Sequence, residues 1–127
     1  MSLGKRILVL DDEEHIRTLY KMELEDEGYR VTTINECRKG LEHIEKGEVD
    51  LLILDIRMPD MDGREVLARV REIDIKLPIV ISSAYPVFKQ EFGVWAADGF
   101  FVKEHDLTKL KEKIRNLLEK PEKEVEK

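Results

Sequence analysis

Short apolar runs recur along the chain and predict strands that are buried on both faces. The clearest run lies between Asp50 and Asp55, where four aliphatic residues stand in a row, and Pro59 breaks the extended chain soon afterwards. The predicted strands lie at residues 6–10, 29–34, 49–55, 78–83 and 99–102. The second of them is β-branched and alternating instead of continuously apolar.

Apolar residues at helical spacing follow the strands and predict the helices between them. The first helix ends at Gly28, the third begins after Asp62, which can cap it, and Asp106 is placed to cap the last. Residues 86–97 favour a short helix more weakly, because proline, glycine and β-branched residues interrupt this segment. The four clearer helices are defined by Ile16, Leu19 and Tyr20; by Cys37, Leu41 and Ile44; by Val66, Leu67 and Val70; and by Leu107, Leu110, Ile114, Leu117 and Leu118, before Pro121.

This alternation predicts an α/β fold in which helices cover both faces of a doubly wound parallel sheet. In such sheets, ligands bind outside the carboxyl ends of the strands, near the point where the strand order reverses. The residues that follow each strand are therefore the candidates for chemistry.

Length and composition indicate one domain of an acidic protein. We assign residues 5–120 to the domain, residues 1–4 to an N-terminal extension or added sequence, and residues 121–127 to a charged tail. The chain has 28 acidic and 22 basic residues, and this excess of negative charge argues against direct nucleic-acid binding. No stretch is long enough to span a membrane. A single cysteine, Cys37, forms no internal disulfide and suits a cytoplasmic protein, and we interpret it as a packing residue.

Polar residues stand at the ends of all five strands, and we assign chemistry to those of four strands, leaving Asn35 and Glu36 after the second strand unassigned. Asp11 and Asp12 follow the first strand and Asp55 ends the third. Ser83 ends the fourth strand and Lys103 follows the fifth. Close carboxylates repel one another, and a divalent cation relieves this repulsion; oxygen ligands of this kind suit Mg²⁺, with Mn²⁺ as an alternative. Beside such a cation and Lys103, Asp55 can act as a nucleophile and form an aspartyl phosphate.

Each candidate also has a simpler interpretation when it is taken alone. Asp11 and Asp12 suit the start of a helix. Ser83 could be an ordinary strand-end hydroxyl and Lys103 a solvated charge. Convergence on one edge of the sheet is what favours a joint site. The histidines, at 15, 43 and 105, have no Cys or His partners at metal-binding spacing, and we interpret them as surface or local structural residues.

Four segments, in this order, resemble the CheY-like receiver domain of two-component response regulators. They are Leu-Val-Leu-Asp-Asp-Glu at 8–13, Leu-Asp-Ile-Arg-Met-Pro-Asp-Met-Asp-Gly at 54–63, Ser-Ala at 83–84, and Lys103. The resemblance extends from about residue 5 to residue 118. It implies a flavodoxin-like, five-stranded parallel sheet with the strand order 2-1-3-4-5.

The resemblance also implies a role for each carboxylate. Asp55 would accept a phosphoryl group from the phosphohistidine of a sensor histidine kinase or a histidine phosphotransfer protein. Asp12 and Asp55 would bind Mg²⁺ directly, and Asp11 would act mainly through a metal-bound water. The backbone carbonyl of Arg57 would be a further ligand.

The remaining matched residues would bind the phosphoryl group, change conformation in response to it, and slow its hydrolysis. Ser83 and Lys103 would bind its oxygens. Movement of Ser83 would let Phe100 turn inward, and this change would reshape the face made by the fourth helix, the fifth strand and the fifth helix. The same face is a candidate surface for a homodimer. Arg57 and Tyr85 lie two residues after the acceptor and after Ser83, and their bulk predicts slow self-dephosphorylation.

One departure from the family pattern keeps other hypotheses open. Glu104 follows Lys103 where the family usually has proline, so the bond between them is either trans with a displaced loop or cis and strained. A second hypothesis is therefore a degenerate receiver that acts as a phosphorylation-independent interaction module. A third is an enzyme that hydrolyses small phosphates through an aspartyl phosphate, against which the short loops argue. The kinase and the downstream protein partner are not readable from the sequence.

Overall fold

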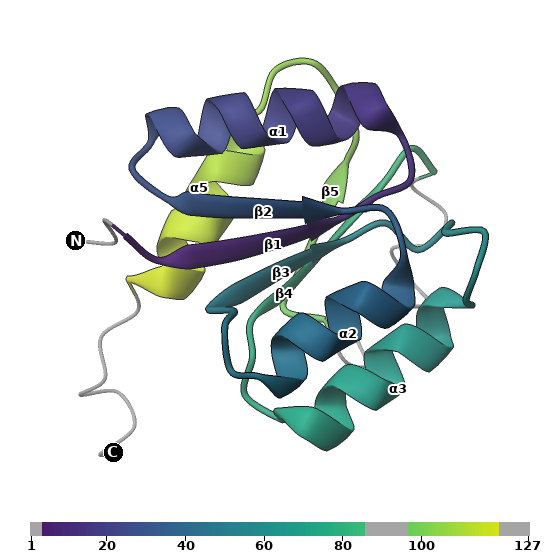
Figure 1. Ribbon diagram of the computed structural model, residues 1–127. Coiled ribbons are helices and arrows are strands. Elements are labelled where there is room, and N and C mark those ends of the chain that lie inside the picture. Colours follow the sequence, from purple (N-terminus) through teal and green to yellow (C-terminus); the bar gives the residue numbers. More distant parts are fainter. Residues whose placement is uncertain (1–3, 86–96, 120–127) are drawn as a thin grey trace.

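The computed structural model describes residues 4–85 and 97–119, in which strands and helices alternate as predicted except across the gap between residues 85 and 97 (Figure 1). The strands are β1 (Arg6–Leu10), β2 (Arg30–Ile34), β3 (Leu51–Leu54), β4 (Ile79–Ser83) and β5 (Gly99–Val102). The helices are α1 (Glu14–Asp26), α2 (Cys37–Glu45), α3 (Gly63–Ile73) and α5 (Thr108–Leu118). The short helix expected within residues 86–97 lies outside the described residues except for its last position. Pro121 also lies outside them.

The strands form one parallel sheet in the order β2-β1-β3-β4-β5, which confirms the predicted doubly wound fold. Helices α1 and α5 lie on one face of the sheet, and α2 and α3 lie on the other (Figure 1). Strand β3 is central, so its carboxyl end opens in the middle of the sheet edge. Within residues 4–85 and 97–119, no helix is long and apolar enough to cross a membrane.

Alternate residues of the strands contribute to two hydrophobic cores. Leu52 and Leu54 of β3 belong to the core under α2 and α3, whereas Leu51 and Ile53 belong to the core under α1 and α5. All four side chains are at most 1% exposed. Burial on both faces explains why this strand is a continuous apolar run in the sequence.

Local signals fix the loops around β3 and α1. Asp62 caps α3 as predicted, because its Oδ1 accepts a hydrogen bond of 2.7 Å from the backbone amide of Arg64. Gly28 follows α1 with a φ of 100°, a conformation that favours glycine. The sequence did not reveal the role of Gly63, where a Cβ would lie 2.9 Å from the Cβ of Ile56. This close approach brings the start of α3 against the loop that follows β3.

Both ends of β3 and the first residues of β2 and β4 differ by one or two positions from the predicted strand boundaries. Strand β2 begins at Arg30 and not at Tyr29, because the Tyr29 amide donates to the carbonyl of Leu24 at 3.3 Å and thus belongs to the end of α1. Strand β3 ends at Leu54, so Asp55 lies one residue beyond it, in the loop. The predicted position of this carboxylate at the mouth of a loop is confirmed.

A polar pair lies inside the core under α1 and α5. Tyr20 of α1 and Ser82 of β4 are both 0% exposed, and their hydroxyl oxygens are 2.7 Å apart. Burial raises the pKa of Tyr20 to about 12, so the phenol stays neutral at physiological pH. The hydrogen bond satisfies two hydroxyls that would be costly to bury alone.

We therefore expect Tyr20→Phe to lower the free energy of unfolding by about 1–3 kcal/mol, because it leaves the Ser82 hydroxyl buried without this partner. Ser82→Ala should have a similar effect on the phenol. The double variant should be less destabilised than the sum of the two single variants, since neither hydroxyl then remains. Urea unfolding of the four proteins measures this, and strict additivity would contradict the prediction.

Candidate functional site

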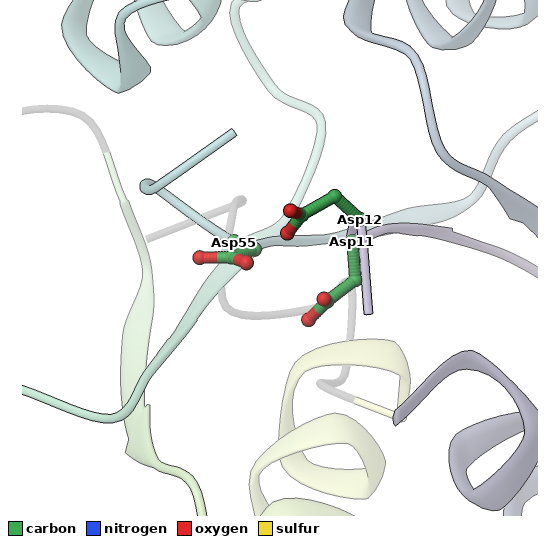
Figure 2. A group of neighbouring side chains, drawn as sticks. All are labelled: Asp11, Asp12 and Asp55. Carbon is green, nitrogen blue, oxygen red and sulfur yellow. The ribbon is translucent and has the colours of Figure 1, made fainter. Parts of the chain in front are cut away.

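The ends of β1 and β3 bring the three predicted carboxylates together. The Asp55 amide donates to the carbonyl of Leu10 at 2.9 Å, which places Asp55 beside the residues that follow β1. Carboxylate oxygens of Asp11, Asp12 and Asp55 lie within 4.8 Å of one another (Figure 2). Asp11 and Asp55 are only 1% and 4% exposed, whereas Asp12 is open to solvent.

Burial and a neighbouring negative charge disfavour the ionised form of Asp11. Its Oδ1 accepts a hydrogen bond of 2.9 Å from the backbone amide of Glu13. Its Oδ2 lies 3.0 Å from Lys103 Nζ and forms an ion pair with it. This oxygen is buried and has no hydrogen-bond partner among the described residues. Burial, together with the charge of Asp55, raises the pKa of Asp11 to about 6, although the Glu13 amide and Lys103 partly oppose this.

Lys103 supplies the positive charge that faces this cluster. Its Nζ is 2.8 Å from Glu13 Oε1, 3.0 Å from Asp11 Oδ2 and 3.4 Å from Asp55 Oδ2. Burial alone would lower the pKa of Lys103, but the hydrogen bond to Glu13, the close contact with Asp11 and the charges of Asp11 and Asp55 outweigh burial, so the net shift of the pKa is upward. The described residues contain no cis peptide bond, so the bond from Lys103 to Glu104 is trans and still lets the lysine reach the site.

The acceptor candidate and the hydroxyl are both held by local hydrogen bonds. Asp55 Oδ1 accepts a bond of 2.9 Å from the backbone amide of Arg57. Ser83, at the end of β4, is 0% exposed, and its Oγ accepts a bond of 3.0 Å from the amide of Tyr85. The backbone of Ser83 also accepts a bond of 2.8 Å from the amide of Lys103, which ties the ends of β4 and β5 together.

Two bulky side chains contact each other at the mouth of the site. The guanidinium carbon of Arg57 lies 4.8 Å from the centroid of the Tyr85 ring, which is a cation–π contact. A cavity of about 280 Å³ opens here. Its lining residues are Asp12, Glu13, Asp55, Arg57, Ala84, Tyr85 and Lys103.

Two other residues singled out in the sequence lie inside the core. Phe100 is 7% exposed and packs in the core under α2 and α3, so its aromatic ring already points inward. Cys37 is 0% exposed, and burial followed by the nearby Asp60 raises its pKa to about 12, which fits the predicted packing role. Its backbone amide donates to Asp60 Oδ2 at 2.9 Å, so the loop after β3 is bonded to the start of α2.

Glu13 is a member of the site that was not predicted from the sequence. It is the nearest carboxylate to Lys103, and the hydrogen bond between them lowers the pKa of Glu13. The available signal was its place directly after Asp11 and Asp12, at the carboxyl end of the first predicted strand. What could not be foreseen is the direction of its side chain, because the bond joins residues 90 positions apart.

The donor set suits a hard divalent cation. Three carboxylates, two of them buried, lie together, the two buried ones contact one ammonium, and one buried oxygen lacks a hydrogen bond among residues 4–85 and 97–119. Oxygen ligands of this kind are those that Mg²⁺ prefers in proteins. The residues present therefore fit such an ion, which would also offset the burial and the repulsion from Asp55 that raise the pKa of Asp11.

Comparison with known proteins places this site in a family. The profile of the response regulator receiver domain matches residues 7–115. The chain belongs to this family. The receiver domain is 36% identical over 115 residues to the transcriptional regulatory protein TrcR of Mycobacterium tuberculosis, covering 89% of this chain and 45% of TrcR. It is 32% identical over 122 residues to the alkaline phosphatase synthesis transcriptional regulatory protein PhoP of Bacillus subtilis, covering 94% of this chain and 51% of PhoP. The receiver domain thus spans about half the length of these curated relatives.

Solved structures give the same result. The receiver domain matches the response regulator TrrA of Thermotoga maritima, solved in complex with Mg²⁺ and beryllium fluoride, with 41% identity and a TM-score of 0.84. The match covers 90% of this chain and 99% of TrrA. TrrA has also been solved in complex with the histidine kinase ThkA, and that copy matches with a TM-score of 0.82. These matches confirm the family that the four sequence segments indicated.

The pKa of Asp11 leads to a test of the electrostatic balance in this receiver domain. Because the folded-state pKa of about 6 is raised, the stability that Asp11 contributes is full below the unfolded pKa and is lost as the pH rises through about 6. In EDTA at about pH 7.5, Asp11→Asn should therefore raise the free energy of unfolding by about 1–3 kcal/mol.

Urea unfolding in EDTA at about pH 5 and pH 7.5 measures the effect, which should be smaller at the lower pH. Asp12→Asn is the matched control, because Asp12 is exposed and water already screens its charge. A stability gain in the control as large as in Asp11→Asn, or a loss in Asp11→Asn at the higher pH, would contradict the prediction.

Proposed function

We propose that this receiver domain accepts a phosphoryl group on Asp55 from the phosphohistidine of a sensor histidine kinase or a histidine phosphotransfer protein. The observation that carries the proposal is the placement of Asp55, which is nearly buried, lines a cavity and faces an ammonium at 3.4 Å. The complex of TrrA with ThkA supports a kinase as the donor, since TrrA is 41% identical to this chain. The same likeness, and the reach of Lys103 across a trans bond, favour a phosphorylatable receiver over a degenerate one.

The carboxylates would hold Mg²⁺, with Mn²⁺ as a substitute. Asp12 and Asp55 would be direct ligands, together with the backbone carbonyl of Arg57, and Asp11 would act mainly through a bound water. The TrrA complex with Mg²⁺ and beryllium fluoride supports this assignment. When bound, the ion would neutralise charge on the carboxylates and on the phosphoryl oxygens.

The chain's own residues would perform the transfer by position and charge. A carboxylate oxygen of Asp55 forms a bond to phosphorus while the bond from phosphorus to the imidazole nitrogen breaks, and its electron pair leaves with the imidazole. Lys103 would donate to one phosphoryl oxygen and Ser83 to another. Because Ser83 Oγ now accepts from the Tyr85 amide, it has to turn toward the new group.

Intact-mass spectrometry after incubation with acetyl phosphate tests the acceptor and the ion together. We expect one phosphoryl adduct with MgCl₂, none in EDTA, and none in Asp55→Asn under either condition. Asp55→Asn preserves the size of the side chain and removes only the nucleophile, so it is the matched control. A magnesium-dependent adduct on Asp55→Asn, or none on the wild type from either acetyl phosphate or a phosphorylated histidine donor, would contradict the proposal.

The same step would supply the output. Movement of Ser83 toward the phosphoryl group would change the packing around Phe100 and reshape the face that includes β5 and α5, with the helix expected in residues 86–97 as its third part. A downstream protein, or a second copy of the chain as a homodimer, would read this face. We place the domain at residues 5–120 and its action in the cytoplasm, and we expect slow self-dephosphorylation as its only other reaction.

The contact between Arg57 and Tyr85 makes the slow loss of phosphate testable. Both side chains line the cavity over Asp55, and together they would exclude the attacking water. Arg57→Ala and Tyr85→Ala should each shorten the half-life of the adduct by about two- to fivefold, the equivalent of a cation–π contact of about 0.5–1 kcal/mol. Decay of the adduct by intact mass gives the half-lives.

The double variant should lose little more than either single variant, because each substitution already breaks the shared contact. Arg64→Ala serves as the control, since Arg64 lies in the same β3–α3 region but does not line the cavity. Half-lives that are unchanged, or longer, in the two single variants would contradict a gating role.

A further inference from the structure

We propose that Glu13 is a positioning residue that holds the Lys103 ammonium in the unphosphorylated protein and has to release it when a phosphoryl group binds. This inference rests on the proposed function of Asp55. It concerns the exchange of partners around one lysine, a step in which the chain gives up an existing ion pair to gain a new one.

The distances show which partner dominates. Lys103 Nζ is 2.8 Å from Glu13 Oε1, 3.0 Å from Asp11 Oδ2 and 3.4 Å from Asp55 Oδ2. The hydrogen bond to Glu13 is thus the shortest, and the contact to the phosphoacceptor is the longest. The ammonium, which is at the end of a side chain only 10% exposed, is drawn toward the mouth of the cavity and away from Asp55.

The side chain of Glu13 has no local task that would explain its direction. Glu13 is the N-cap residue of α1, with extended backbone angles of φ −89° and ψ 118°, yet its side chain caps no helix amide. Its own amide is fixed by a bond of 2.9 Å to Asp11 Oδ1, which anchors the backbone from which the carboxylate reaches across to Lys103. The anchored backbone and the shared lysine place the carboxylate at the mouth of the site.

The solvent exposure of the three carboxylates indicates which of them would give up its contact with the Lys103 ammonium. The Asp11 and Asp55 side chains are 1% and 5% exposed, so neither can leave the ammonium for water. Glu13 is 46% exposed and can turn into solvent with its charge hydrated. An incoming anion on Asp55 would therefore take the ammonium from Glu13. An exposed ion pair is worth about 0.2–1 kcal/mol, so its loss should change anion affinity by up to about fivefold.

Equilibrium binding of beryllium fluoride in saturating MgCl₂ tests the inference, with the acetyl phosphate adduct rate as a second readout. We expect Glu13→Gln to bind beryllium fluoride about two- to fivefold more tightly than the wild type. Glu13→Asp keeps the charge but shortens the side chain by one methylene, so it should also bind more tightly if contact with Lys103 is the cause. Glu14→Gln removes the next charge along the chain, which makes no contact with Lys103 in the structure, and should match the wild type.

The outcomes separate this inference from the proposed function. Tighter binding in both Glu13 variants, with Glu14→Gln unchanged, supports the exchange. Wild-type affinity in Glu13→Asp, equal gains in Glu13→Gln and Glu14→Gln, or weaker binding in Glu13→Gln would overturn it, because bulk charge or an active orienting role would then explain Glu13. A wild-type protein that neither binds beryllium fluoride nor accepts phosphate from acetyl phosphate would instead contradict the function of Asp55.

Discussion

Two buried carboxylates share one ammonium at the carboxyl edge of the sheet, and this unequal balance of charge governs the rest of the site. Buried charges are costly unless they are paired, and the pairing is incomplete because Asp11 keeps a raised pKa even with Lys103 beside it. A cation improves the balance, whereas a phosphoryl group without a cation would worsen it. The proposed metal ion and the proposed phosphoryl group would therefore act on the same charge balance, in opposite directions.

Backbone hydrogen bonds hold the strand ends, and therefore the charged residues of the site, close together. The Asp55 amide is bonded to Leu10, and the Lys103 amide is bonded to Ser83, so the charged groups cannot drift apart by moving their strands. Relief has to come from side chains or from a ligand. A parallel sheet with both faces covered is well suited to this, since its interior is rigid and its chemistry lies at the open ends of the strands.

The sequence was sufficient for the fold and for bringing the three aspartates and Lys103 to one edge of the sheet, because both depend on simple patterns. A run such as Leu51–Leu54 is buried on both faces, so its hydrophobicity is continuous and its end is easy to locate. Contacts between side chains distant in sequence were less accessible. Neither the bond from Glu13 to Lys103 nor the one from Tyr20 to Ser82 leaves a periodic signal, because each depends on the packing of separate elements.

The burial of Cys37 has a practical consequence for experiments on this protein. Cys37 is the single cysteine of the chain, it is 0% exposed, and its pKa of about 12 keeps the thiol protonated. Maleimide dyes and nitroxide spin labels react with accessible thiolates, so the native sulfur is silent toward them. A cysteine introduced at an exposed position such as Met22, which is 59% exposed, can be labelled selectively in the otherwise native sequence.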